Sequence, residues 1–119
     1  MAWEVEYTDQ FGEWFEGLDS KNRARVRAAI NVLADIGPGL GRPFVDTLKG
    51  SRHPNMKELR PRGGHTRVLF AFDPRRTAIL LIGGDKTGRW QRWYEEAIPV
   101  ADRLYDEYLE ELRREGELQ

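Results

Sequence analysis

The chain has 119 residues, the size of a single domain that is long enough to bury a hydrophobic core. It contains no cysteine, which excludes disulfide bonds, cysteine-based metal sites and cysteine nucleophiles. The net charge of −1 is unevenly distributed, because residues 42–93 carry twelve Lys and Arg against four Asp and Glu, whereas residues 1–41 sum to −3 and residues 94–119 to −6.

A basic middle third indicates an anionic partner, for which nucleic acid is the commonest candidate. The N-terminus lacks a basic segment followed by an apolar leader, and no apolar run approaches the length that spans a membrane. We therefore expect a single domain over residues 1–119, in a soluble cytoplasmic protein without a membrane partner.

The N-terminal third predicts a strand followed by two helices. Apolar and acidic residues alternate over Trp3–Tyr7, as in a half-buried strand, and Thr8 is a favourable cap for the helix that follows. Asp19 or Ser20 begins the second helix. The two helices have apolar faces with the spacing of amphipathic helices, namely Phe11, Trp14, Phe15 and Leu18, and then Val26, Ala29, Ile30, Leu33 and Ile36.

Gly37–Pro43 ends the second helix and opens a segment that we interpret as a loop to about Asn55. The segment precedes the strand-like part of the chain, so we expect it to lie beside a sheet. Long basic loops often carry binding residues, and the candidates here are Lys49 and Arg52.

Three strand-like runs, separated by short turns, predict an antiparallel meander over Met56–Pro61, Thr66–Phe72 and Thr77–Ile82. Period-two alternation divides the meander into an apolar face, with Leu59, Val68, Phe70 and Phe72, and a charged face, with Glu58, Arg60, Arg67 and Leu69. The simpler interpretation of the charged face is a solvated surface with a cross-strand charge pair between Glu58 and Arg67. The alternative is a binding surface.

Gly83–Gly88 predicts a flexible turn, and Arg89–Tyr94 then interleaves basic and aromatic residues. This pattern suits single-stranded nucleic acid, because aromatic rings stack on unpaired bases while Arg side chains hold phosphates. The alternative is that Trp90 or Trp93 covers an edge of the core. Pro99 is expected in the first turn of a last helix, whose apolar face comprises Ala101, Leu104, Tyr105, Tyr108 and Leu112.

The chain resembles the HigB branch of the RelE-type toxins, small ribonucleases of bacterial toxin–antitoxin modules, in Asn55–Arg60, Arg67–Pro74 and Ala78–Lys86, followed by Tyr94 and the pair Ala101-Asp102. The resemblance implies a compact α+β fold with an N-terminal strand, two helices, an antiparallel meander of three strands that completes a four-stranded sheet, and a C-terminal helix.

The resemblance also implies a function. The chain would be the toxin of a type II toxin–antitoxin module, a ribosome-dependent endoribonuclease that cleaves translated mRNA in the A site and inhibits translation. The implied partners are mRNA on the ribosome and a HigA-like helix-turn-helix antitoxin. Promoter DNA would be bound only through the antitoxin. No metal or cofactor is implied.

At the positions that match the family, the implied catalytic residues are Lys57, Arg60, Arg67, Lys86 and Tyr94. The residues expected to contact RNA around them are Lys49, Arg52, Glu58, His65, Arg89, Trp90 and Arg92. Strict alternation places Lys57 on the same face as Leu59, so Lys57 joins Arg60 only if a bulge or a strand end redirects one of them.

RNA cleavage by the 2′-hydroxyl needs a base for that hydroxyl, an acid for the leaving 5′-oxygen and stabilisation of the phosphate charge. The two arginines suit the last role, because a guanidinium pairs with phosphate oxygens in a fixed geometry. Lys57, Lys86 or Glu58 could be the base, and Tyr94 or His65 the acid.

A second hypothesis is a catalytically weak or inactive module of the same fold, which binds RNA or protein and is retained for its antitoxin complex. It predicts RNA affinity without cleavage. A small-molecule enzyme has little support, since the sequence contains no cofactor fingerprint and no recognisable metal-ligand or Ser-His-Asp spacing.

Overall fold

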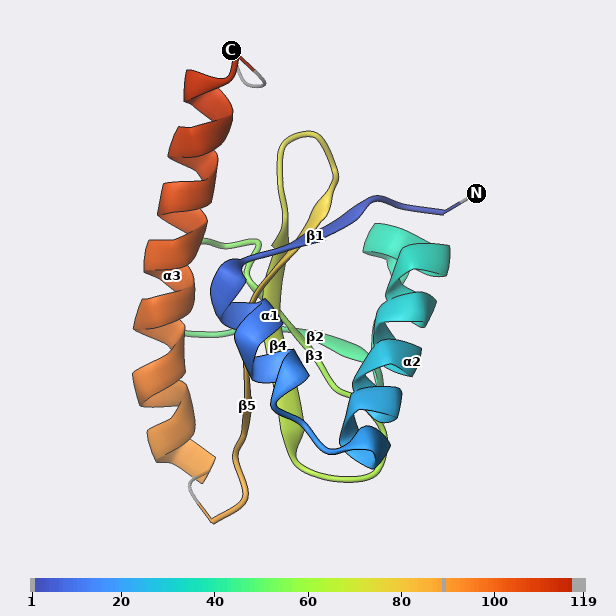
Figure 1. Ribbon diagram of the computed structural model, residues 1–119. Coiled ribbons are helices and arrows are strands. Elements are labelled where there is room, and N and C mark those ends of the chain that lie inside the picture. The colour runs from blue at the N-terminus through green and yellow to red at the C-terminus, as the bar shows by residue number, and fades with distance from the viewer. Residues whose placement is uncertain (1, 89, 117–119) are drawn as a thin grey trace.

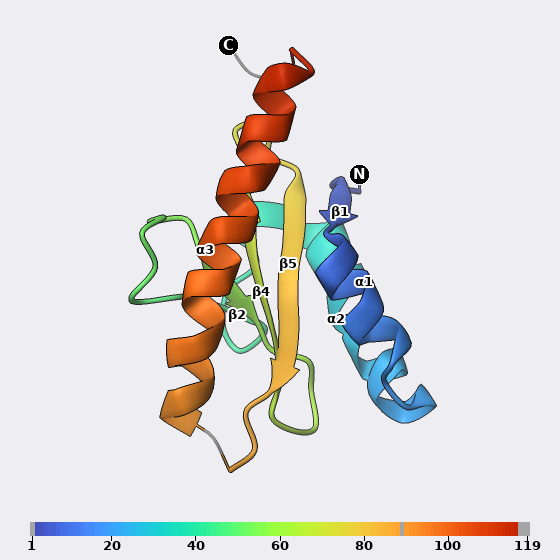
Figure 2. The same ribbon diagram turned by 60° about the vertical axis from the view of Figure 1, so that its left-hand side comes forward.

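The computed structural model describes residues 2–88 and 90–116. In these ranges the elements are β1 (Val5–Tyr7), α1 (Asp9–Glu16), α2 (Ser20–Ile36), the 3-10 turn η1 (Gly37–Gly39), β2 (Val45–Thr47), β3 (Lys57–Leu59), β4 (Thr66–Phe72), β5 (Ala78–Asp85) and α3 (Trp90–Arg114). The sheet stands between α3 on one side and the pair α1 and α2 on the other (Figures 1 and 2). None of the helices in the described ranges is long and apolar enough to cross a membrane.

Both N-terminal helices begin at the residues that the sequence predicts. The Thr8 hydroxyl accepts a hydrogen bond from the amide of Phe11 at 3.0 Å and donates one to the carbonyl of Leu81 at 2.7 Å, so the cap of α1 also ties this helix to β5. Asp19 caps α2 by accepting from the amide of Asn22 at 2.8 Å. Each cap satisfies a backbone N–H that the first helical turn leaves free.

The sheet has the strand order β1-β5-β4-β3-β2, with β1 parallel to β5 and the other neighbours antiparallel. The predicted meander is confirmed as β3, β4 and β5. The described residues form five strands rather than four, because Val45–Thr47, inside the predicted loop, pairs with β3 as an edge strand. Three residues contain too little alternation for a sequence pattern to identify them.

The sheet buries apolar side chains on both faces. The core under α1 and α2 contains Phe11, Val26, Ala29, Leu33, Val45, Leu59, Val68, Phe70, Ala78 and Leu80. The core under α3 contains Met56, Leu69, Ala71, Ile79, Leu81, Trp93, Ala97, Ala101, Leu104 and Tyr105. This second face is the charged face of the sequence analysis. Its interpretation as a solvated surface was therefore wrong, because helix α3 covers it. Only the polar end of this face remains available for contacts with other molecules.

Helix α3 begins at Trp90 rather than near Pro99, which lies inside the helix. Its buried stripe continues through the proline, since Trp93 and Ala97 precede Ala101 at helical spacing and enter the same core. Pro99 lies on the exposed side, where water can satisfy the carbonyl that loses its helical partner. Close approach of the helix depends on Gly84 of β5, where an added Cβ would lie 2.3 Å from the Trp93 indole nitrogen.

Candidate active site

The polar end of the α3-covered face carries a cluster of charged and phenolic side chains around Glu58, which is only 3% exposed. We call this the site cluster; its members are Glu58 of β3, Arg60 just after β3, Arg67 of β4, Lys86 just after β5 and Tyr94 of α3. The meander and the helix that follows it thus bring together five residues that lie apart in the sequence.

Both arginines of the site cluster engage the Glu58 carboxylate. The Arg60 Nε donates to Glu58 Oε2 at 3.0 Å, and the Arg67 Nε lies 3.7 Å from Oε1. Arg60 is the more accessible of the two, with 34% of its side chain exposed against 12% for Arg67. Arg60 also reaches Asp46 of β2 at 3.4 Å. The carboxylate therefore orients two guanidinium groups toward one region, as phosphate binding requires.

Tyr94 and Lys86 form a chain of hydrogen bonds that ends on the same carboxylate. The Lys86 Nζ donates to the Tyr94 hydroxyl at 3.2 Å, and the Tyr94 hydroxyl donates to Glu58 Oε1. Lys86 is only 3% exposed, and its Nζ lies 3.4 Å from the centroid of the Trp90 ring, in a cation–π contact.

The environment shifts the proton affinities of both groups. Burial, together with the positive charge of Arg67, lowers the pKa of Lys86 from its ordinary value. Burial and the hydrogen bond to Glu58 raise the pKa of Tyr94 to about 12. At neutral pH the phenol therefore keeps its proton, whereas the ammonium group of Lys86 is a stronger acid than that of a free lysine.

A shift in the pairing of β4 with β5 determines which face Lys86 reaches. Two consecutive residues, Leu81 and Ile82, both pack on the α3 side, because the register of the two strands changes at this point. Beyond this β-bulge the side chains alternate between the two faces again, but each residue lies on the face opposite to the one it would have in a regular strand. Lys86 therefore lies on the same face as Arg67, whereas a regular strand would turn it toward α1 and α2.

Two concave surfaces adjoin the site cluster. A groove of about 1080 Å³ is lined by Glu58, Arg60 and Tyr94 of the cluster, and its other charged lining residues are Arg42, Asp46, Lys49, Arg52, Glu95 and Asp102. A smaller hollow of about 300 Å³ is lined by Arg60, Arg62 and Arg67 and contains no acidic side chain. The groove has mixed charge, so the hollow is the more favourable place for a phosphate.

The structure separates Lys57 from the other catalytic candidates. Lys57 pairs with Phe70, whose ring belongs to the core under α1 and α2, so the side chain of Lys57 lies across the sheet from Glu58. No bulge in β3 redirects it. The alternation argument was right here, and the prediction that Lys57 joins the site was wrong.

The predicted RNA contacts are only partly gathered at the site cluster. Trp90, 59% exposed, covers Lys86, and the ring of His65 lies 6.1 Å from that of Trp90. Arg92 is exposed, but it follows Trp90 by two residues on α3 and therefore points to the opposite side of the helix. Arg89 lies outside the described residues.

The two loop candidates, Lys49 and Arg52, line the larger groove. Arg52 is held to α3, since its guanidinium pairs with Asp106 and its backbone amide donates to Asp102 at 3.1 Å. Sequence reasoning assigned no site role to Asp102, which it used only for the family resemblance, and it did not name Asp46, which lies opposite Glu58 in the register of β2 and β3. No local signal identifies Asp46, because the three residues of Val45–Thr47 are too few for alternation to predict a strand.

No group of three or more acidic or histidine side chains among residues 2–88 and 90–116 is arranged to hold a metal ion. The site cluster combines one carboxylate with three cations and a phenol, a set suited to binding an anion and to moving protons.

Comparison with known proteins identifies the family. Residues 13–106 match the family described as "Phage derived protein Gp49-like (DUF891)". The protein named "Putative toxin HigB3" of Mycobacterium tuberculosis (strain ATCC 25618 / H37Rv) is 52% identical over 100 residues, which cover 84% of this chain and 88% of that protein. This chain belongs to the Gp49-like family, and the protein named HigB3 is its relative. The resemblance stated from the sequence is confirmed.

A second relative of this Gp49-like chain is longer. "Putative toxin HigB2" of the same organism is 48% identical over 112 residues, which cover 92% of this chain but 55% of that protein. The chain therefore spans about half the length of this curated relative.

Solved RelE structures share the fold of the Gp49-like chain. The crystal structure of the isolated E. coli RelE toxin matches with a TM-score of 0.61 at 14% identity, covering 82% of this chain and 97% of that one. The archaeal RelE-RelB complex from Pyrococcus horikoshii OT3 matches with a TM-score of 0.59 at 20% identity, covering 75% and 99%. At these identities the likeness shows the fold alone, and it confirms the predicted α+β architecture.

Proposed function

We propose that this chain is the toxin of a type II toxin–antitoxin module and acts in the cytoplasm as a ribosome-dependent endoribonuclease, cleaving translated mRNA in the A site and so inhibiting translation. The observation that carries the proposal is the convergence of Arg60, Arg67, Lys86 and Tyr94 on Glu58, on one face of the sheet and beside a groove. Family membership with proteins named as toxins supports it.

In this proposal the scissile phosphate occupies the hollow beside Arg60, Arg62 and Arg67. Three guanidinium groups line this hollow without a competing acidic side chain. Guanidinium groups bind phosphate oxygens bidentately and stabilise the additional negative charge of the pentacoordinate transition state. Trp90 lies next to Lys86 and is 59% exposed, and it offers a stacking surface for an unpaired base.

The proton transfers follow the chain of hydrogen bonds. Tyr94 accepts the proton of the 2′-hydroxyl while passing its own proton to Glu58, and the 2′-oxygen attacks phosphorus. The bond from phosphorus to the 5′-oxygen breaks, and the ammonium group of Lys86 protonates that oxygen, leaving a 2′,3′-cyclic phosphate. The lowered pKa of Lys86 makes it a better acid, and the hydrogen bond from Tyr94 to Glu58 provides the relay.

One observation favours the second hypothesis, a catalytically weak or inactive module that binds RNA or protein. Glu58 already neutralises part of the charge of Arg60 and Arg67, so a phosphate must compete with a carboxylate for these guanidinium groups. Such a module would bind RNA without cleaving it. With about five phosphate contacts, the logarithm of its RNA affinity would fall with the logarithm of salt concentration at a slope near −3.5, at roughly −0.7 per contact for single strands.

The implied partner is a cognate antitoxin, for which we propose a HigA-like helix-turn-helix protein that alone contacts promoter DNA. Several structural neighbours are described as toxin–antitoxin complexes, among them the intact E. coli RelBE complex. Co-expression of this chain with its candidate antitoxin should restore growth and yield a complex that resists dissociation during gel filtration.

The deciding experiment is inducible expression of this chain in a bacterium, with growth and mRNA 5′ ends followed in the same culture. Growth arrest with new 5′ ends inside translated codons is the expected result. Tyr94→Phe should abolish both effects, whereas Arg92→Gln, on the other side of α3, should retain them. Normal growth and unchanged 5′ ends in cells that contain folded protein would contradict the nuclease and favour the binding module.

A further inference from the structure

The smaller hollow beside the site cluster has one wall that is mostly backbone. Its lining includes Arg62, Gly63 and Gly64, which belong to the loop between β3 and β4. We call residues 62–64 the glycine loop. Because glycine has no side chain, peptide groups form this part of the lining. A ligand in the hollow can therefore contact backbone groups that a larger side chain would cover.

The amides of the glycine loop are available to such a ligand. None of the three donates a hydrogen bond to a group in the described part of the chain. Gly63 and Gly64 have φ values of 79° and 151°, a region that glycine adopts without strain. Successive N–H groups in a turn can converge on one anion, as they do in many phosphate sites. The glycine loop thus has the backbone geometry of an anion site.

Arg62 adds a positive charge that no carboxylate neutralises. Arg60 and Arg67 both engage Glu58, whereas Arg62 is exposed and forms no ion pair with any residue in the described ranges. A phosphate must compete with a carboxylate at the first two arginines, but it meets no such competitor at Arg62. The glycine loop is therefore the end of the hollow where an anion binds most favourably.

Arg25 of α2 holds the glycine loop in place. Its Nη1 donates to the carbonyl of Gly63 at 2.5 Å, and a Cβ added to Gly63 would lie only 3.0 Å from the guanidinium carbon. The carbonyl of Gly63 and the amide of Gly64 belong to the same peptide group. A charged donor on that carbonyl polarises the peptide and makes its N–H a stronger donor. Arg25 thus both fixes the loop and strengthens its interaction with an anion.

We propose that the glycine loop is an anion cradle for an RNA phosphate, and that Arg25 is the positioning residue that holds this cradle in shape. The amides and the Arg62 guanidinium bind the phosphate oxygens, while Arg60 and Arg67 approach from the site cluster. The inference deepens the proposed function and rests on it for the identity of the ligand. Binding of a phosphate to the loop is a separate property that is measured without cleavage.

The test titrates inorganic phosphate into the isotope-labelled full chain, without ribosomes, and follows the amide resonances. We expect the largest shifts, saturating with phosphate concentration, at Arg62, Gly63 and Gly64. Acetate at equal ionic strength should cause only small changes there. A short single-stranded RNA should shift the same resonances at lower concentration, because its further phosphates and bases add contacts.

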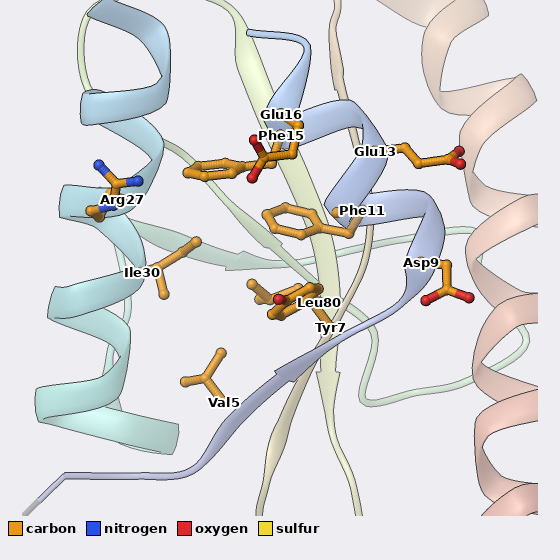
Figure 3. A pocket seen from close by; sticks show the side chains of 11 residues that line it. Val5, Tyr7, Asp9, Phe11, Glu13, Phe15, Glu16, Arg27, Ile30 and Leu80 are labelled. Carbon is orange, nitrogen blue, oxygen red and sulfur yellow. The ribbon is translucent and has the colours of Figure 1, made fainter. Parts of the chain in front are cut away.

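Two arginine substitutions separate binding from positioning. Arg62→Gln removes the unpaired charge and should weaken phosphate binding by about tenfold. Arg25→Gln removes the bond to Gly63 and should weaken binding by about fivefold. Arg27→Gln is the matched control for a lost charge on α2. Arg27 lies in a separate pocket (Figure 3), where its guanidinium carbon is 5.4 Å from the centroid of the Phe15 ring.

Gly64→Ala tests the backbone of the loop without changing any charge. The φ of 151° is unfavourable for alanine, and no atom lies within 4 Å of the added Cβ, so the loop changes its conformation rather than relieving a clash. We expect phosphate binding to weaken. Gly116→Ala is the matched control, because Gly116 also has a positive φ, of 75°, with open space around it. It should bind phosphate as wild type does.

Arg25→Gln should also increase the fast motion of the Gly63 and Gly64 amides in relaxation measurements, while circular dichroism shows an unchanged fold. Phosphate shifts that are absent from the glycine loop, or are equally large with acetate, would refute the cradle. Equal affinity in Arg25→Gln and Arg27→Gln would refute the positioning role. Phosphate binding at the loop in a chain that causes no growth arrest would contradict the nuclease alone.

Discussion

Replacing Glu58 by glutamine tests whether one buried carboxylate organises the site cluster. The side chain keeps its size and one acceptor oxygen but loses the negative charge that Arg60 and Arg67 approach at 3.0 and 3.7 Å. Three cations then remain around a neutral amide, and the most buried of them, Lys86, is only 3% exposed. We therefore expect Glu58→Gln to destabilise the fold as well as to disable cleavage.

The size of the loss in stability depends on how easily each cation can become hydrated once the carboxylate charge is removed. Removing one partner of a fully buried ion pair costs about 3–5 kcal/mol, because the other charge stays unpaired. Arg60 is one-third exposed and has Asp46 within 3.4 Å, so it can turn away at little cost. Arg67 and Lys86 cannot, and we expect the free energy of unfolding to fall by about 2–4 kcal/mol.

Urea unfolding followed by circular dichroism measures this loss. Glu95→Gln is the matched control, since Glu95 is an exposed carboxylate that lines the same groove, and it should stay within about 0.5 kcal/mol of wild type. If Glu58→Gln also stayed within that range, the carboxylate would not hold the cluster together, and the relay assigned to it would lose its structural basis.

Three further predictions test the site and its supports. Tyr94→Phe removes the hydroxyl that donates to Glu58 but keeps the ring, so single-turnover cleavage of ribosome-bound mRNA should fall by about a hundredfold or more. The raised pKa of Tyr94, about 12 against an ordinary 10, means that the folded state holds this proton more tightly; relative to Tyr94→Phe, wild-type stability in urea should therefore be constant below pH 10 and fall as the pH rises toward 12. Gly84→Ala places a Cβ 2.3 Å from the Trp93 indole and should cost about 1–3 kcal/mol in thermal unfolding, whereas Gly41→Ala, with nothing within 4 Å, should be neutral.

The sequence predicts those parts of the fold that depend on local patterns. The cap at Thr8, the two N-terminal helices and the meander all follow from neighbouring residues, and the structure contains them. The predicted flexible turn Gly83–Gly88 was wrong in its first half, because β5 continues through Asp85 by pairing with β4. The start of α3 was wrong because Pro99 is a common first-turn residue, and only the packing of Trp93 and Ala97 against the sheet extends the helix past it. Strand β2 was missed because three residues become a strand only through their partner β3.

The site was predicted less completely than the fold, because it also depends on contacts between residues that are far apart in the sequence. The family resemblance indicated Arg60, Arg67, Lys86 and Tyr94, and the structure brings them together, although their roles are still proposals. It also indicated Lys57, which period-two alternation places on the other face. The central position of Glu58 has no local signal, because a carboxylate in a strand pattern is usually a surface residue until the elements that cover it are known.

The register of β5 links the packing of the core to the position of a proposed catalytic residue. Ala78–Ile82 is apolar at every position, so period two cannot show where the strand changes phase. Packing decides it, because Leu81 and Ile82 both find apolar contacts under α3 when the pairing with β4 shifts by one residue. That shift carries Lys86 to the face that holds Arg67. The position of a proposed catalytic lysine is thus set by how two aliphatic side chains fill the core, which explains why motif spacing alone could not place it.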